Sequence, residues 1–448
     1  ILELCDLIPC VPGCWSTMDD SEPQMDVYSG VRWSVVAKYG AQLVEVCASV
    51  FVARLVAPEA YGLVGMAIVI TGFLQVFQSL GLGSALVQRK QISESLLSSL
   101  FFISLGIGVV TTAVLVCGAP LASWIYGDAR VGPVVAVLGM SFLVSAPALV
   151  PSALLTRQLA FRQLAWIDIG VAALRSVVVL VLAFAGWHVW ALVWSSIIGV
   201  AGRTVLSFLY TDWRPRWLFS RGEVRGVFGF GANLTGFSIV NYFARNADNF
   251  LIGTFLGATS LGHYSLAYRI LMFPCEAITN TLGRVTFPAF SRMQDDDARL
   301  KAAYLRVCGV IALVTFPLMT GMAAVARPFV EVVLGPSWLP AVPLIWVLAP
   351  LGAVQSIGVT AGQLFLAKGR ADWMFRWGVV AGTLYIGSFL VGLPWGMLGI
   401  AVSYSVTSLV LMTLGCHIAF KLVSGLRVRD LGETLLPYGI SAAVMGIL

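Results

Sequence analysis

A polar face runs along an otherwise apolar segment between residues 227 and 256. Asn241, Arg245, Asp248 and Asn249 recur at positions i, i+4, i+7 and i+8, which places their side chains on one side of an α-helix. Ionisable residues within a membrane segment are costly and commonly mark a functional site. Two interpretations follow. Arg245 and Asp248 form a structural pair, since residues at i and i+3 can neutralise each other, or their face serves a ligand.

Three other apolar segments carry similar faces at helical spacing: Lys38, Gln42, Glu45 and Ser49; Asp168 and Arg175; and Arg269, Glu276, Asn280 and Arg284. At about 2.5 kcal/mol for each charge placed in lipid, eight charged side chains from all four faces would together cost roughly 20 kcal/mol. They are Lys38, Glu45, Asp168, Arg175, Arg245, Asp248, Arg269 and Glu276. A typical folding stability is only about 5 to 15 kcal/mol. These faces are therefore expected to point toward one another or toward a wet cavity.

The composition indicates an integral membrane protein. Hydrophobic residues make up 58% of the chain and charged residues 11%, and the mean hydropathy is +0.89. Apolar segments lie near 31–56, 62–86, 96–118, 131–155, 164–186 and 189–210, then near 227–256, 261–290, 304–326, 338–366, 373–394 and 397–423, with a further one beginning near 432. The loops between them are too short for a soluble catalytic domain.

The two sets of six segments resemble each other. At an offset of 200 residues Gly62 aligns with Gly262, and at an offset of 208 Pro120 aligns with Pro328 and Arg162 with Arg370. An even number of helices separates the copies, so the repeat is parallel, and sites in such folds lie between the halves near the midplane. Glu45 and Arg245 occupy equivalent repeat positions, which favours a functional interpretation of the polar faces.

The expected fold is an all-α polytopic membrane protein with two six-helix bundles. We expect a non-native or disordered tail at 1–24, a first half at 30–213, a basic linker at 214–226, a second half at 227–424 and the start of a truncated thirteenth helix at 431–448. The true start is expected at Met18 or Met25, and the coding sequence is expected to continue beyond Leu448. The tail cysteines Cys5, Cys10 and Cys14 match no metal pattern well, and no metal site is expected.

Lys and Arg gather in alternate loops, for example in DWRPRWLFSRGEVRG (212–226), while the opposite turns hold little more than Arg54, Arg130 and Arg327. This asymmetry predicts a cytoplasmic N-terminus. It also accounts for the net charge of +6 without a nucleic-acid partner. Tryptophans expected to act as interfacial anchors are Trp187, Trp190, Trp213, Trp217, Trp338 and Trp395.

Several stretches resemble the bacterial oligosaccharide flippases of the polysaccharide exporter family, in particular exporters of the colanic-acid type. The resemblance covers residues 30–425 and rests on GVRWSVVAKYG, ARLVAPEAYGLVGMA, LGLGSALVQRKQIS, YSLAYRI and RVTFPAFSRMQDD. Its turn motif A-R-L-x-x-P-E-x-Y-G supplies Arg54, Pro58, Glu59, Tyr61 and Gly62. The superfamily also holds drug and sodium antiporters and a murein-precursor flippase, and similar members have fourteen helices.

The resemblance implies alternating-access movement of undecaprenyl-diphosphate-linked oligosaccharide across the bacterial inner membrane, for lipopolysaccharide or exopolysaccharide (O-antigen) assembly. Arginines would pair with the diphosphate, and Asn and Gln with sugar. Carboxylates such as Glu45 or Asp248 would release an arginine when substrate arrives, or would bind a coupling proton or sodium ion. No other cofactor is expected. A polysaccharide polymerase and a chain-length regulator are implied partners beside the lipid bilayer. The predicted substrate-binding residues are Lys38, Gln42, Glu45, Arg175, Asn241, Arg245, Asp248, Asn249, Arg269, Glu276 and Arg284.

Two other functions are weighed against the flippase. A cation-coupled drug antiporter of the same superfamily would favour an acidic cavity, whereas the polar faces with Arg54 and Arg284 included lean basic. A membrane glycosyltransferase or polymerase would need a catalytic acid or metal site, but Glu59, Asp128 and Glu331 form no pair in the outer loops. No phosphate-binding loop sequence is present, which disfavours ATP-driven transport in this chain. We therefore expect a transporter and not an enzyme.

Overall fold

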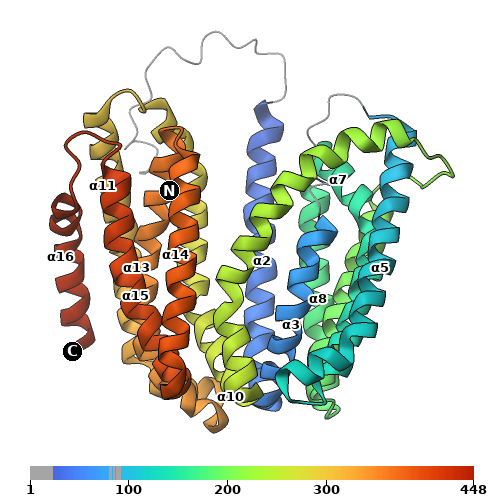
Figure 1. Cartoon of the computed structure of the whole chain (residues 1–448), viewed down its shortest axis with the longest axis horizontal. Coiled ribbons are helices and arrows are strands. Elements are labelled where there is room, and N and C mark those ends of the chain that lie inside the picture. Colours follow the sequence, from blue (N-terminus) through green and yellow to red (C-terminus); the bar gives the residue numbers. More distant parts are fainter. Residues whose placement is uncertain (1–23, 80–82, 84–85, 87–91, 448) are drawn as a thin grey trace.

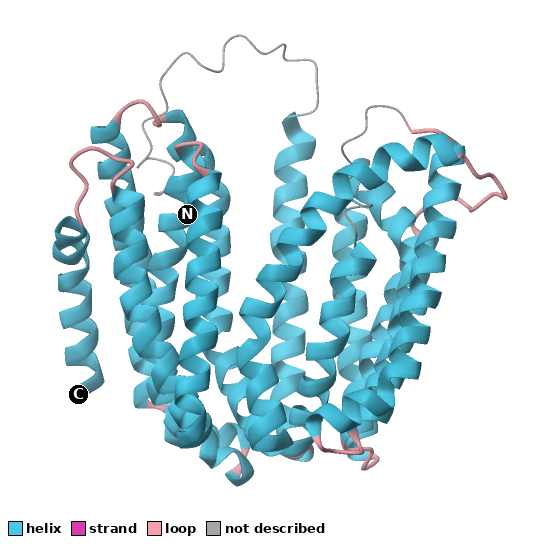
Figure 2. Cartoon of the chain, viewed as in Figure 1, coloured by secondary structure: helices cyan, strands magenta, loops and turns pink. Residues whose placement is uncertain are grey.

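The computed structural model describes residues 24–79, 83, 86 and 92–447. These residues form helices joined by short turns, with no strand among them (Figure 2). The predicted tail lies outside the described residues except for Gln24, and so do Cys5, Cys10 and Cys14.

Each apolar segment predicted in the first half corresponds to a helix. Serine and glycine define both ends of α5, because the Ser93 side chain accepts a hydrogen bond from the Leu96 N–H and Gly127 adopts a left-handed conformation (φ 66°). The helices are α2 (Gln24–Leu55), α3 (Pro58–Ser79), α5 (Glu94–Tyr126), α6 (Val131–Ser145) continued by η1 (Ala146–Ala148) and α7 (Leu149–Arg157), α8 (Phe161–Phe184) and α9 (Val189–Leu209).

The second half begins with α10 (Arg221–Arg292), which changes direction at Gly257 (φ 82°, ψ 176°) and so forms two successive helices. Because α10 begins at Arg221, part of the predicted basic linker is helical. The remaining elements are α11 (Asp297–Ala324), α12 (Ala326–Phe329), η2 (Val330–Leu334), η3 (Pro336–Ala341), α13 (Val342–Ala367), α14 (Ala371–Gly392), η4 (Leu393–Trp395), α15 (Gly396–Phe420) and α16 (Val428–Ile447).

The chain is a multi-span membrane protein. Eight helical stretches of the described part are long and apolar enough to cross a membrane. Helices α2 and α10 are not among these eight, in keeping with the polar residues that they carry. Figure 1 places α2 at the middle of the molecule, between one group of helices from each half, and the green first part of α10 runs obliquely from the top of the right-hand group to the lower middle.

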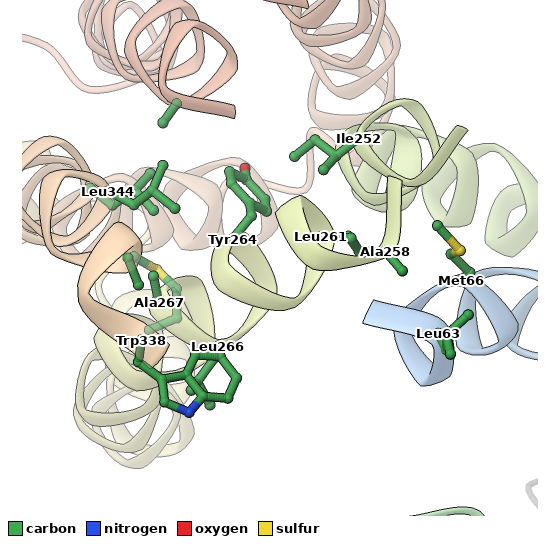
Figure 3. Packing of buried hydrophobic residues seen from close by; sticks show 14 of the residues in the cluster. Leu63, Met66, Ile252, Ala258, Leu261, Tyr264, Leu266, Ala267, Trp338 and Leu344 are labelled. Carbon is green, nitrogen blue, oxygen red and sulfur yellow. The ribbon is translucent and has the colours of Figure 1, made fainter. Parts of the chain in front are cut away.

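The two ends of the molecule are packed differently. We call the end with the loops at 210–220, 368–370 and 421–427 the basic end, and the end with the turns near residues 57, 128, 186 and 257 the turn end. At the turn end a single buried cluster joins the halves, with Leu63 and Met66 of α3 against Ala258 and Leu261 of α10 (Figure 3). At the basic end the clusters are separate, one around Leu97 and Val150 and another around Phe290 and Leu364. The helices accordingly diverge toward the basic end (Figure 1).

The prediction for Trp338 is wrong. Its side chain is fully buried in the cluster that joins the halves, and its indole N–H donates to the Ala53 carbonyl at 2.7 Å. Residues 326–341 fold into the short helices α12, η2 and η3, which turn this tryptophan away from the membrane surface and toward α2.

Candidate substrate-binding site

The polar face of α10 lies on the first of its two helices. Arg245 precedes the turn at Gly257 by roughly 18 Å of helix, at a rise of about 1.5 Å per residue, which is near the middle of a bilayer core of about 30 Å. Its side chain is exposed, Asn249 is half-buried and Asp248 is only 7% exposed. Of the predicted site residues, the side chains of Lys38, Asn241, Glu276 and Arg284 lie outside the described part of the structure.

Arg245 and Asp248 do not pair. Both residues are described, yet no ion pair joins them, and Asp248 is held by other groups. Its carboxylate accepts hydrogen bonds from the Tyr264 hydroxyl at 3.0 Å and from the Asn249 backbone N–H at 2.7 Å. This geometry contradicts the structural pair, and it also contradicts a role for Asp248 as a temporary partner of Arg245. The spacing i, i+3 permits a pair, but Asp248 instead binds Tyr264, which follows the turn at Gly257.

The sequence analysis missed the tyrosines around Asp248. Tyr264 and Tyr268 stack at 6.2 Å between ring centroids, and the Tyr404 ring packs edge-on against Tyr385 at 5.1 Å. The Gln355 amide donates to the Tyr404 hydroxyl at 2.8 Å. This cluster comes from α10, α13, α14 and α15. The i, i+4 spacing of Tyr264 and Tyr268 is a signal that could have identified part of it.

Two ion pairs join neighbouring helices of the first half. The Arg175 guanidinium of α8 lies 3.5 Å from the Glu45 carboxylate of α2, and Arg203 of α9 lies 2.9 Å from Asp168 of α8. All four side chains are between about two-fifths and one-half exposed. The structure thus brings together Glu45 and Arg175 as predicted site residues, and it adds Arg203.

Two further predicted residues have polar groups that are incompletely satisfied. The Gln42 side-chain oxygen is buried without a hydrogen-bond partner among the described residues. Arg269 is exposed on the second helix of α10, near enough to Tyr61 for an electrostatic interaction. No carboxylate within the described part of the chain forms an ion pair with Arg245 or with Arg269. Among the side chains of α10 that the structure describes, Arg245 and Arg269 are thus exposed cations without a carboxylate partner.

The turn motif lies at the turn end and not beside Arg245. Its residues contact the second half or Arg130; they are Arg54, Pro58, Glu59, Tyr61 and Gly62. They are part of the contact between the halves and do not share the polar face of α10.

The chain is thus a helical, multi-span membrane protein of two halves, and the described residues hold no cluster of possible metal ligands. Residues 51–343 match the family model described as polysaccharide biosynthesis protein. The match covers more than half of the chain, so the chain belongs to this family.

The chain aligns with curated relatives over nearly its whole length. The chain is 28% identical over 424 residues to the lipopolysaccharide biosynthesis protein WzxC of Escherichia coli (strain K12), covering 92% of this chain and 85% of that protein. It is 28% identical over 425 residues to the teichuronic acid biosynthesis protein TuaB of Bacillus subtilis (strain 168), covering 94% and 88%.

Solved structures show the same fold. The lipid II flippase MurJ in an inward closed conformation matches with a TM-score of 0.73 at 15% identity, covering 92% of this chain and 91% of that one. An inward-facing multidrug resistance MATE transporter of the MOP superfamily matches with a TM-score of 0.65, also at 15% identity, covering 92% and 98%. The all-α membrane fold predicted from the sequence is thus confirmed.

Proposed function

We propose that this chain moves undecaprenyl-diphosphate-linked oligosaccharide across the bacterial inner membrane, and that the Arg245 guanidinium binds the diphosphate. Membership of a polysaccharide biosynthesis family supports the substrate class, as do relatives named for lipopolysaccharide and teichuronic acid biosynthesis. A flippase for lipid II among the proteins of the same fold is consistent with a lipid-linked substrate.

The observation that carries the proposal is the isolation of Arg245. It lies within the first helix of α10, its side chain is exposed, and the nearest carboxylate in sequence, Asp248, is buried against Tyr264. A planar guanidinium can donate two parallel hydrogen bonds to a phosphate group. Its attraction to such an anion grows as the surrounding dielectric falls. Arg269 would add a second positive charge from the second helix of α10.

The proposed orientation places the basic end and the N-terminus in the cytoplasm. The concentration of Arg and Lys in the loops of that end favours this orientation. The turn end, where one core joins the halves, then faces the outer side. Separate cores at the basic end suit a state that receives substrate from the cytoplasmic leaflet.

Asp248 is proposed as the coupling residue, which exchanges a proton or a sodium ion. A carboxylate buried without a nearby cation carries a desolvation penalty when it is charged. A bound proton or cation would remove that penalty. Movement of α10 during transport would change the exposure of Asp248. Binding of a proton or a sodium ion to this carboxylate would then be coupled to movement of the substrate. Antiport of a cationic drug is less well supported, because the exposed side chains of this face are arginines while the carboxylate is buried.

The proposal is tested by replacing Arg245 in cells that depend on this protein for polymer export. Arg245→Gln should leave the amount of protein in the membrane unchanged and reduce export at least about tenfold, because hydrogen bonds to charged groups contribute about 1.5 to 3 kcal/mol. Arg245→Lys keeps the charge without the two-pronged geometry and should give intermediate export.

Arg299→Gln is the matched control. Arg299 is exposed at the basic end and pairs with Asp296 in the adjacent turn, so its replacement should leave export unchanged. Wild-type export by Arg245→Gln would overturn the assignment of the diphosphate site.

A further inference from the structure

The turn motif at residues 53–62 makes polar contacts with the opposite half. The indole N–H of Trp338 donates to the Ala53 carbonyl at 2.7 Å, and the Arg54 Nε donates to the Val333 carbonyl at 2.9 Å. The Tyr61 ring packs edge-on against the Trp338 ring at 5.2 Å. Because Trp338 is fully buried, its N–H would lose its hydrogen-bond partner if the halves separated without rearrangement.

The same motif brings the two backbones into direct contact. A methyl group added to Gly62 would overlap the carbonyl group of Ala258, and one added to Gly262 would overlap the carbonyl group of Pro58. These contacts are reciprocal at the sequence offset of 200 residues, since Pro58 aligns with Ala258 and Gly62 with Gly262. Reciprocal contacts are expected where a two-fold axis relates the surfaces that meet. Leu63, Met66, Ala258 and Leu261 surround this contact (Figure 3).

We infer that these contacts form a clasp that closes the turn end and must open for substrate to be released there. The clasp consists of Ala53, Arg54, Pro58, Tyr61 and Gly62 on one side and Ala258, Gly262, Val333 and Trp338 on the other. The inference rests on the proposed transport function and assigns the turn motif a task within it.

The construction of the clasp suits a contact that opens and closes. Two hydrogen bonds and one aromatic contact hold the motif to residues 333–338, and glycines allow the helices to approach without interlocking side chains at Gly62 and Gly262. Separation also requires the buried cluster around Leu63, Met66 and Leu261 to part. When the clasp opens, the Arg54 Nε and the Trp338 N–H lose their carbonyl partners and become available to water or substrate.

Opening is measured with a single reporter cysteine at Gln75, in a chain whose native cysteines are replaced by alanine. Gln75 is an exposed residue of α3, roughly 20 Å along the helix from Gly62 toward the basic end. A membrane-impermeant thiol reagent added from the turn-end side should reach it only when the clasp is open. Trp338→Phe combined with Arg54→Gln should raise the labelling rate about tenfold, because both hydrogen bonds across the clasp are lost.

Matched variants separate this effect from general damage. Trp395→Phe changes an exposed tryptophan of η4 and should not alter labelling. Gly262→Val should wedge the clasp open and raise labelling, whereas Gly106→Val, at an exposed position of α5 with open space around it, should not. If Gly262→Val does not fold, the Trp338 and Arg54 variant still decides the result. Equal labelling in the clasp variant and in the parent would overturn the inference.

A cross-link gives the converse test. Cysteines in place of Arg54 and Val333, joined by a short reducible bis-thiol reagent, should stop polymer export until the reagent is reduced. Export at the parental rate by the fully cross-linked protein would contradict the clasp. If the parent exports no polymer but labelling of the Gln75 cysteine responds as expected, the proposed substrate is wrong while the clasp stands.

Discussion

Charged side chains in the two halves have different environments. In the first half, Glu45 pairs with Arg175 and Asp168 pairs with Arg203, each time across two helices. In the second half, Asp248 is buried against Tyr264 and Arg245 is exposed without a carboxylate partner among the described residues. Similar polar faces in sequence therefore have different structural roles.

The difference separates charges that are neutralised by a neighbouring helix from a charge that has no ion-pair partner among the described residues. A pair such as Glu45 and Arg175 is complete within the protein, so neither member needs substrate for neutralisation. Arg245 remains a net positive charge at membrane depth, where an isolated charge is costly. An anionic partner from outside the chain would remove part of that cost. The largest functional effects are therefore expected on α10 and the smallest at exposed ion pairs.

The largest of the three effects below is expected for Asp248→Asn. The change keeps the shape of the side chain and its contact with Tyr264 but removes the carboxylate that is proposed to exchange a proton or a sodium ion. Export should then lose its response to a proton or sodium gradient while binding of the lipid carrier persists. Transport into vesicles under a pH gradient and, separately, a sodium gradient measures this response. An unchanged response to both gradients would show that Asp248 takes no part in coupling.

An intermediate effect is expected when the pair between α2 and α8 is broken. Glu45→Arg places two arginines together and should lower the free energy of unfolding by about 1 kcal/mol or somewhat more, given the partial exposure of the pair. The exchange Glu45→Arg with Arg175→Glu should restore stability and export, because only mutual neutralisation is required. Thermal unfolding of the purified variants checks the first part and polymer export the second. Failure of the exchanged pair to export would indicate a direct substrate role for one of the two residues.

The smallest effect is expected at the turn end. Arg130 bridges Glu59 at 2.7 Å and Asp128 at 2.8 Å, and its guanidinium, through hydrogen bonding and charge, holds the pKa of Asp128 below its usual value. A lowered pKa stabilises the fold above the usual carboxyl pKa of about 3.9, and this contribution is lost as the pH falls through the lowered value. Arg130→Gln should therefore lower stability at pH 7 by at most about 1 kcal/mol, since the pair is exposed.

Thermal unfolding of wild type and Arg130→Gln at pH 7 and at acidic pH checks this prediction. The difference between the two proteins should shrink as the carboxylates become protonated. A difference that grows toward acid would require another role for Arg130.

The helices could be predicted from the sequence, whereas the partners of the charged residues could not. Apolar windows mark the helices because the interior of a membrane requires continuous hydrogen-bonded backbone. The predicted break between the segments 227–256 and 261–290 corresponds to the change of direction at Gly257. Spacing along one helix shows which side chains share a face, but not which side chain of another helix lies opposite. Arg175 is 130 residues away from Glu45 in the chain, and no local pattern connects them.

Two errors have the same origin. The i, i+3 spacing favours a contact between Arg245 and Asp248, but the turn at Gly257 brings back Tyr264, which binds Asp248 instead. Trp338 lies between apolar segments, as an interfacial anchor would, but the short helices η2 and η3 bury it against Ala53. In each case a contact across a turn decides the position of the side chain.

Binding of undecaprenyl diphosphate to the purified protein tests the central claim most directly. The lipid should bind Arg245→Gln at least about tenfold more weakly than wild type, through the loss of charge-assisted hydrogen bonds. Arg175→Gln, which removes an arginine already paired with Glu45, should change the affinity by less than about twofold, since little is expected from an exposed pair. Equal affinity of wild type and Arg245→Gln, or a greater loss with Arg175→Gln, would contradict the assignment of the diphosphate to the unpaired arginine of α10.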